Sequence, residues 1–299
     1  MNNKPLLPVK SDFIFKAIFG DQRNVEILAG FLKSILDIPD NEYERLTIVD
    51  PHIKKESEHD KYGILDVKIH TKSMSIVHVE IQLQVFPDLK QRLIYSQSKL
   101  FTEQISSGQD WSVIKRVITI IITDEVFIPD SADYFNQFRY RTKNNIEFSN
   151  LSEINSLELN KLPSETDETE LWYWTKFIKS DDEEVLDMLA QNNPQIKKAV
   201  AVLKELSADE RTRMLNDERE MARRDYVSRM NWARSEGLAE GRAEGRAEGR
   251  AEGKAEGKAE GRAEEIRNIA CNAIKMNMDI EAIMNLTGLS REDIEALKS

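Results

Sequence analysis

The sequence contains very little cysteine and histidine: one cysteine, Cys271, and four histidines among 299 residues. A single cysteine excludes an intrachain disulfide and is typical of reducing compartments, so we expect a cytoplasmic protein. The shortage of both residue types argues against a structural zinc cluster.

Long hydrophobic runs are absent as well. No apolar stretch approaches the roughly 18–20 residues that cross a bilayer. Residues 1–8 lack the apolar centre of a secretory signal. We therefore expect no membrane association.

An excess of positive charge is also absent, because 42 Lys and Arg stand against 53 Asp and Glu and the formal net charge is −11. Residues 1–150 hold 19 Lys and Arg against 21 Asp and Glu, whereas residues 151–299 hold 23 against 32. This balance argues against tight non-specific binding of nucleic acid, which depends on phosphate contacts. It does not exclude a nuclease, because the nearly neutral first half offers basic residues for such contacts: Lys10, Lys16, Arg92, Lys99, Lys115 and Arg116.

What the sequence does contain is a pair of strand-like segments that carry carboxylates, residues 64–69 (Ile-Leu-Asp-Val-Lys-Ile) and 76–83 (Ile-Val-His-Val-Glu-Ile-Gln-Leu). Alternation of apolar and polar residues is typical of a strand with one packed and one solvated face. The short polar link between the segments predicts an antiparallel hairpin. A register centred near Ser73 would place Asp66 opposite Glu80, and Lys68 opposite His78, on the solvated face.

Directly opposed Cβ atoms in such a hairpin lie roughly 4.5–5.5 Å apart. Two carboxylates at that distance repel each other unless a proton or a cation lies between them, and oxygen ligands suit Mg²⁺. Asp66 and Glu80 therefore suggest a divalent-metal site, with Gln82 on the same face. The alternative is a set of ordinary surface charges in which Lys68 pairs with either carboxylate.

The motif Asp66–x13–Glu80-Ile81-Gln82 resembles the PD-(D/E)XK nuclease superfamily. Within it, the chain is similar to the Rpn recombination-promoting nucleases, also described as PD-(D/E)XK transposases. Other stretches agree with that group: residues 10–20 (Lys-Ser-Asp-Phe-Ile-Phe-Lys-Ala-Ile-Phe-Gly), residues 91–100 (Gln-Arg-Leu-Ile-Tyr-Ser-Gln-Ser-Lys-Leu) and a Gly-Arg-Ala-Glu repeat in the tail.

The resemblance implies a metal-dependent DNA endonuclease linked to recombination. Asp66 and Glu80 would bind Mg²⁺ or Mn²⁺, and Gln82, which stands where the superfamily usually has lysine, would orient the attacking water. Lys68, on the same expected face, would supply the missing positive charge. The remaining candidates are expected at the substrate-binding rim: Asp12, Lys16 and Arg92.

A second class of function fits some of the same features. The glutamine two residues after Glu80, the acidic balance and the long tail are also expected of a catalytically degenerate nuclease-fold protein. Such a protein would act as an oligomeric interaction or regulatory module.

The order of the elements predicts an α/β fold, with a PD-(D/E)XK restriction-endonuclease-like core of mixed sheet flanked by helices and an all-α C-terminal extension. The apolar run at 117–123 predicts a central strand, and strand-like pieces within 134–162 are expected to complete the sheet edge. The expected regions are a nuclease-like domain (1–185), a helical region (186–235), a repeat helix or linker (236–265) and a small helical module (266–299).

Two parts of the second half permit more than one interpretation. The aromatic segment 171–178 fits a helix docked on the core better than a base-stacking platform, because it is not accompanied by a basic groove. The last segment, 266–299, has the helix and turn pattern of a helix-turn-helix, but its final helix is acidic and would repel DNA. A packing or dimerisation module is therefore favoured there.

Glycine recurs at every fourth position from 237 to 261 in the repeat. Seven interior glycines cost a helix roughly 7 kcal/mol relative to alanine. The segment is therefore either a flexible linker or a helix stabilised by a second copy. We expect a homo-oligomer formed through the C-terminal region.

Overall fold

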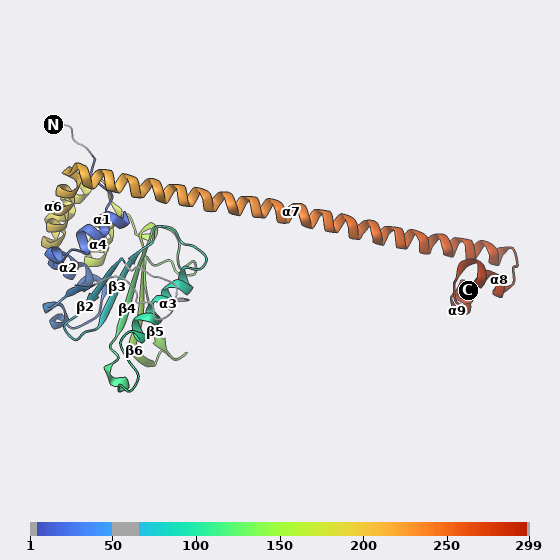
Figure 1. Ribbon diagram of the computed structural model, residues 1–299, viewed down its shortest axis with the longest axis horizontal. Coiled ribbons are helices and arrows are strands. Elements are labelled where there is room, and N and C mark those ends of the chain that lie inside the picture. Colours follow the sequence, from blue (N-terminus) through green and yellow to red (C-terminus); the bar gives the residue numbers. More distant parts are fainter. Residues whose placement is uncertain (1–4, 50–65, 298–299) are drawn as a thin grey trace. The chain divides into compact units, whose positions relative to one another are not determined.

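The computed structural model describes residues 5–49 and 66–297 (Figure 1). The charged loop expected at 51–62, with Glu56, Glu58 and Asp60, lies outside the described residues, as do the first two residues of the segment 64–69. The chain divides into two compact units, Met1–Ala222 and Arg223–Ser299.

The first unit is built on a mixed six-stranded sheet with the strand order β1-β2-β3-β4-β6-β5. Its strands are β1 (Thr47–Val49), β2 (Val67–His70), β3 (Ile76–Ile81), β4 (Val117–Thr123), β5 (Phe135–Arg141) and β6 (Glu147–Glu158). The pairs β3–β4 and β4–β6 are parallel, and the other neighbouring pairs are antiparallel. The edge strands are β1 and β5. The strand-like pieces expected within 134–162 complete this end of the sheet: β5 is its edge, and β6 pairs with β4 on one side and with β5 on the other.

Helices lie on both sides of this sheet, as the sequence predicts for an α/β layered fold (Figure 1). The α-helices are α1 (Asp12–Phe19), α2 (Val25–Ile35), α3 (Leu89–Thr102), α4 (Glu170–Lys179), α5 (Glu183–Asn192), α6 (Pro194–Ala208) and the start of α7 (Glu210–Lys275). Short 3₁₀ turns connect them: η1 (Gln22–Asn24), η2 (Asp40–Glu44), η3 (Trp111–Val113) and η4 (Leu159–Lys161).

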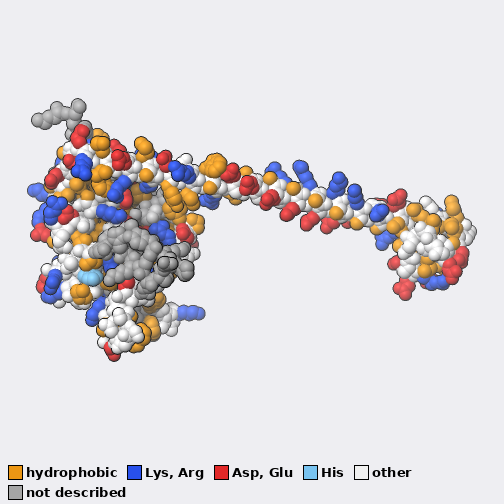
Figure 2. Space-filling model, viewed as in Figure 1, with side chains coloured by type: hydrophobic (Ala, Val, Ile, Leu, Met, Phe, Trp, Pro, Cys, Tyr) orange, Lys and Arg blue, Asp and Glu red, His pale blue; other side chains and the backbone are white. Residues whose placement is uncertain are grey.

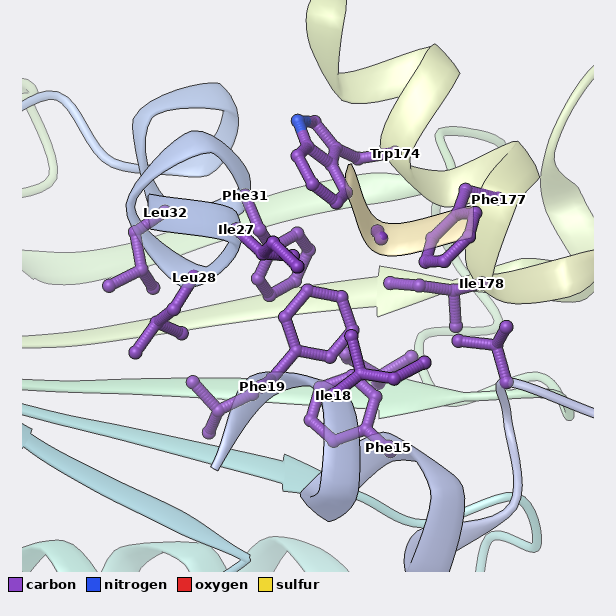
Figure 3. Packing of buried hydrophobic residues seen from close by; sticks show 14 of the residues in the cluster. Phe15, Ile18, Phe19, Ile27, Leu28, Phe31, Leu32, Trp174, Phe177 and Ile178 are labelled. Atoms are coloured by element: carbon purple, nitrogen blue, oxygen red, sulfur yellow. The ribbon is translucent and has the colours of Figure 1, made fainter. Parts of the chain in front are cut away.

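The main hydrophobic core lies between one face of the sheet and helices α1, α2, α4, α5 and α6. At its centre aromatic rings pack edge to face or tilted (Figure 3), and the rings of Phe31 and Trp174 are 5.9 Å apart. Trp174 and Phe177 of α4 are fully buried, which confirms that the aromatic segment docks on the core. Buried residues of α5 and α6, such as Leu186 and Leu203, belong to the same core, which therefore continues beyond residue 185.

The opposite face of the sheet is covered by α3. Leu93 and Leu100 of α3 are buried against β4 and the start of β3. The amide of Gln97 donates a hydrogen bond across to the Glu153 carbonyl of β6 at 2.9 Å. The sequence predicted a solvated face here for the hairpin β2–β3. That prediction is wrong, because α3 removes much of this face from water and leaves His78 fully buried.

The second unit contains the rest of α7 with α8 (Ile280–Thr287) and α9 (Arg291–Ala296). A small core of Ala270, Ala273, Ile283 and Ile294 holds these helices together. Asp279 caps α8, and Ser290 forms a capping box with Asp293 at the start of α9, as their positions in the sequence predict.

The glycine repeat is helical throughout, as part of the continuous helix α7. The sequence left two alternatives for this segment, a flexible linker or a helix, and the segment is a helix in the structure. Among the described helices, none is long and apolar enough to cross a membrane.

Candidate active site

The hairpin formed by β2 and β3 has the predicted register. Val67 pairs with Val79 and Lys68 pairs with His78. Continuing this alternation by one residue places Asp66, which directly precedes β2, opposite Glu80. The two carboxylates therefore meet where the hairpin opens, next to the end of β3.

Asp66 is held by two donors. The Lys16 ammonium of α1 lies 2.8 Å from its Oδ1, and the main-chain N–H of Ile81 donates to its Oδ2 at 2.7 Å. The Asp66 side chain is only 13% exposed. Burial raises its pKa, while the charge and hydrogen bond of Lys16 act in the opposite direction. Asp66 is therefore held in one position, and the positive charge of Lys16 stabilises its ionised form.

Glu80 is held by a different basic side chain, that of Arg92. A guanidinium nitrogen of Arg92, on the first turn of α3, lies 3.1 Å from its Oε1. Burial raises the pKa of Glu80 to about 7; Arg92 opposes this shift, whereas the negative charge of Asp66 adds to it. The electrostatic effect of Asp66 on Glu80 shows that the two carboxylates lie close enough to repel each other, as the sequence predicts.

Lys68 and His78 form the neighbouring pair on the same face of the hairpin, two residues from Asp66 and Glu80, respectively. The Lys68 ammonium pairs with Glu103, directly after α3, at 3.1 Å, and neither site carboxylate is among its ion-pair partners in the described part of the chain. His78 is completely buried, and its Nε2 lies 3.8 Å from Oε2 of Glu80. Burial and the charge of Lys68 lower the pKa of His78 to about 3, which keeps the imidazole neutral.

Sequence reasoning placed His78 on the face of Glu80 without naming it as a site residue, and it missed Glu103. Both ring nitrogens of His78 lack a hydrogen-bond partner among the described residues. A signal was available for His78, because residues two apart on a strand share a face and His78 precedes Glu80 by two. Glu103 gave no comparable signal, since its pairing with Lys68 depends on how α3 packs on the sheet.

Gln82 follows directly after β3. Its main-chain N–H donates to the Ile122 carbonyl of β4 at 2.8 Å, and its side chain is half-buried. Asp12, at the start of α1, lies 3.9 Å from Arg219 of α7, and its charge contributes to the raised pKa of Asp66. Lys16 and Arg92, expected at the rim, instead contact the two carboxylates directly.

Two other basic residues expected to contact phosphate are engaged elsewhere. Lys10 pairs with Asp124 at 2.7 Å, and Arg116 pairs with the buried Glu153 at 2.5 Å. Arg116 therefore serves a network inside the sheet, in which Arg139 also binds Glu153.

The donor set suits a hard divalent cation with few protein ligands. Asp66 and Glu80 offer carboxylate oxygens, and each has a pKa raised by burial, so a cation there would offset an existing cost. Among the described residues, no group of three or more His, Cys, Asp or Glu side chains is arranged to hold a metal. Mg²⁺ characteristically keeps several waters and takes one or two carboxylates, which fits such a pair.

A family model described as PD-(D/E)XK nuclease family transposase matches residues 9–233, which is 225 of the 299 residues. The chain belongs to this family, and the resemblance recognised in the sequence is confirmed. The mixed sheet flanked by helices is consistent with the fold expected of it. No curated protein and no solved structure shows a significant match to the chain.

Proposed function

From this membership of the PD-(D/E)XK nuclease family, we propose that the protein is a metal-dependent DNA endonuclease that hydrolyses phosphodiester bonds at the open end of the hairpin β2–β3. One observation carries the proposal. Two largely buried carboxylates, Asp66 and Glu80, lie where the hairpin register continues beyond β2, and each is bound by a basic side chain from a separate helix.

Asp66 and Glu80 would hold the metal ion, Mg²⁺ or Mn²⁺. When bound, such an ion supplies Lewis-acid polarisation of the scissile phosphate and lowers the pKa of water. The chain's own contribution is to fix both carboxylates before substrate arrives. Asp66 is anchored by the N–H of Ile81, and α3 shields Glu80 from bulk water. Preorganised groups of this kind need no rearrangement during the reaction.

Lys16 supplies the positive charge that the motif position, occupied by Gln82, lacks. Its ammonium already lies 2.8 Å from Asp66, and its side chain remains one-third exposed. With a divalent cation held by Asp66, the ammonium would be available to a phosphate oxygen at the same place. The geometry favours Lys16 over Lys68 for this role, because Lys68 pairs with Glu103.

Arg92 and Gln82 complete the arrangement. The Arg92 side chain is about half exposed, so its guanidinium can exchange Glu80 for a phosphate, which it can bind through two parallel hydrogen bonds. Gln82 would orient the attacking water with its amide, which both donates and accepts hydrogen bonds. Asp12 lies on the same side of α1 and would limit how closely a phosphate approaches Asp66.

A link to DNA recombination and a cytoplasmic location are part of the same proposal. They rest on the family and on the single cysteine, respectively. The degenerate-site alternative is supported by the glutamine at position 82, the acidic balance and the long tail. The two candidates differ in whether the protein binds a catalytic metal.

Calorimetric titration of the full-length protein with Mg²⁺ and Mn²⁺ tests the proposal. The wild-type protein should bind one of these ions, and Asp66→Asn and Glu80→Gln should each weaken binding by at least about tenfold, because each removes an ionised ligand. Asp110→Asn, which changes charge equally on the exposed turn η3, serves as the matched control. Equal binding by all four proteins would contradict the proposed site.

A further inference from the structure

The repeat on α7 carries its acidic and basic side chains on opposite sides. Successive residues of an α-helix turn by about 100°, so each Glu of the repeat lies about 200° from the Arg or Lys two positions later. Residues 240–262 contain Glu at every fourth position from Glu240 and Arg or Lys at every fourth position from Arg242. Figure 2 shows the result along α7, with basic side chains gathered on one side and acidic ones on the other.

Nothing in the described chain covers this part of the helix. Every residue from 231 to 265 is exposed. A Cβ atom added at any of the seven glycines would meet no atom within 4 Å. Like charges occupy positions four apart, which destabilises a single helix, and the glycines cost it roughly 7 kcal/mol relative to alanine. The isolated helix is therefore poorly stabilised by its own contacts.

We propose that the repeat of α7 pairs with the same helix of a second copy, in parallel and in register. Charge complementarity selects the second copy and its direction. In a parallel pair related by a two-fold axis along the helices, the acidic side of each copy adjoins the basic side of the other. Glu240 then lies within two residues, about 3 Å along the axis, of Arg242 in the partner helix.

An antiparallel pair has the opposite electrostatics. Its two-fold axis is perpendicular to the helices, so the acidic sides of both copies lie together and the basic sides lie together. Like charges placed side by side cost free energy, so the antiparallel pair is less stable than the parallel pair. The parallel pair is isologous and closed, so it gives a dimer rather than a filament.

The small residues between the charged sides permit close approach of the helices. A four-residue repeat drifts by about 40° per repeat relative to the helix surface, so straight helices stay in favourable contact for about three repeats. Ridges of residues four apart pack with crossing angles near −50°. The contact is therefore a short parallel crossing within 237–261, flanked by ion pairs on both sides.

Parallel pairing has a consequence that rests on the proposed nuclease function. Each copy contributes one hairpin site and can hydrolyse one strand at a time. A dimer joined through equivalent positions of α7 supplies two sites, so both strands of a duplex could be cut in one binding event. Failure of dimerisation and failure of cleavage can be told apart, because the following experiments measure association without DNA.

Charge variants test whether the ion pairs drive association. One full-length variant carries Glu248→Lys, Glu252→Lys and Glu256→Lys, and the other carries Arg246→Glu, Arg250→Glu and Lys254→Glu. In analytical ultracentrifugation at micromolar concentration and low salt, the wild-type protein should sediment as a dimer that dissociates as salt rises. Each variant alone should be monomeric, and an equimolar mixture should recover the dimer.

Recovery in the mixture shows that neither variant failed simply because it unfolded. Monomeric wild-type protein, dimeric single variants, or a mixture that stays monomeric would each overturn the proposal.

Spin labels test the direction of pairing. In a Cys271→Ser background, a single cysteine is introduced by Ala239→Cys in one protein and by Ala263→Cys in another. In the parallel pair the helices diverge only through their crossing angle, so both label-to-label distances stay short and their sum stays well below 70 Å. In an antiparallel pair the two label-to-label distances would add up to roughly 70 Å whatever the register, because 24 residues of helix separate the two positions. A sum of that size, or the absence of any distance, would overturn the parallel arrangement.

Discussion

The ammonium of Lys16 lies 2.8 Å from the carboxylate of Asp66, so the lysine at this carboxylate comes from helix α1 and not from the strand that carries the motif. The motif position itself holds Gln82. In the proposed mechanism, the Lys16 ammonium and the Gln82 amide would share the tasks that one lysine at the motif position would otherwise perform.

Replacing Lys16 should therefore affect catalysis more than folding. We expect Lys16→Met to lower kcat by about 10²–10³-fold, the usual effect of removing one charge-stabilising donor from a transition state. Lys16→Arg should retain part of the activity because the charge remains. Lys68→Met is the matched control, and it should lower kcat by less than tenfold while lowering Tm, because it leaves Glu103 without its lysine. A larger loss of kcat in Lys68→Met than in Lys16→Met would reverse the assignment.

Gln82 gives a prediction about water. Gln82→Ala should lose at least about tenfold in kcat, since no amide then orients the nucleophile. Gln82→Lys should keep measurable activity, because the new ammonium stands where the superfamily pattern has one. Initial rates on a supercoiled plasmid compare the two variants, and circular dichroism checks that both fold. A wild-type rate for Gln82→Ala would show that Gln82 has no role in catalysis.

Glu80 predicts how the stability of the metal-free protein depends on pH. Burial raises its pKa from an ordinary 4.5 to about 7, so the folded protein holds a proton that the unfolded chain releases. Between about pH 4.5 and 7 the free energy of unfolding should fall as pH rises, by about 3 kcal/mol in total, and level off above pH 7. Glu80→Gln lacks this titration.

Urea denaturation of the two proteins at pH 5 and pH 8, with chelator present, measures the effect. The wild-type protein should lose stability relative to Glu80→Gln between the two pH values. Saturating Mg²⁺ should reduce the loss, because metal binding favours the ionised carboxylate. Parallel pH dependence of the two proteins would show that Glu80 is ionised at both pH values.

Much of the hairpin could be predicted from the sequence. Period-two alternation and a short polar link fix the pairing of Lys68 with His78, and the rest of the register follows. The aromatic segment on α4 and the capping residues of α8 and α9 were predictable for similar reasons, since each depends on local pattern.

The surroundings of the site depended on tertiary packing and could not be predicted in the same way. Alternation in β3 is the same whether its polar face meets water or a helix, so the burial of His78 under α3 left no local sign. The contact of Lys16 with Asp66 joins segments far apart in the chain, and no periodicity encodes it. The helical state of the glycine repeat opposes local propensity, which explains why two alternatives were expected there.

The most direct test of the account is cleavage of supercoiled plasmid by the full-length protein in Mg²⁺, compared with Asp66→Asn, Glu80→Gln and the control Asp110→Asn. The account predicts nicked or linear product from the wild-type protein and from Asp110→Asn, none with chelator, and rates at least about 10³-fold lower for the two site variants, a loss of several kcal/mol of transition-state stabilisation. Cleavage by Asp66→Asn or Glu80→Gln at the wild-type rate, or no metal-dependent cleavage by the wild-type protein, would contradict it.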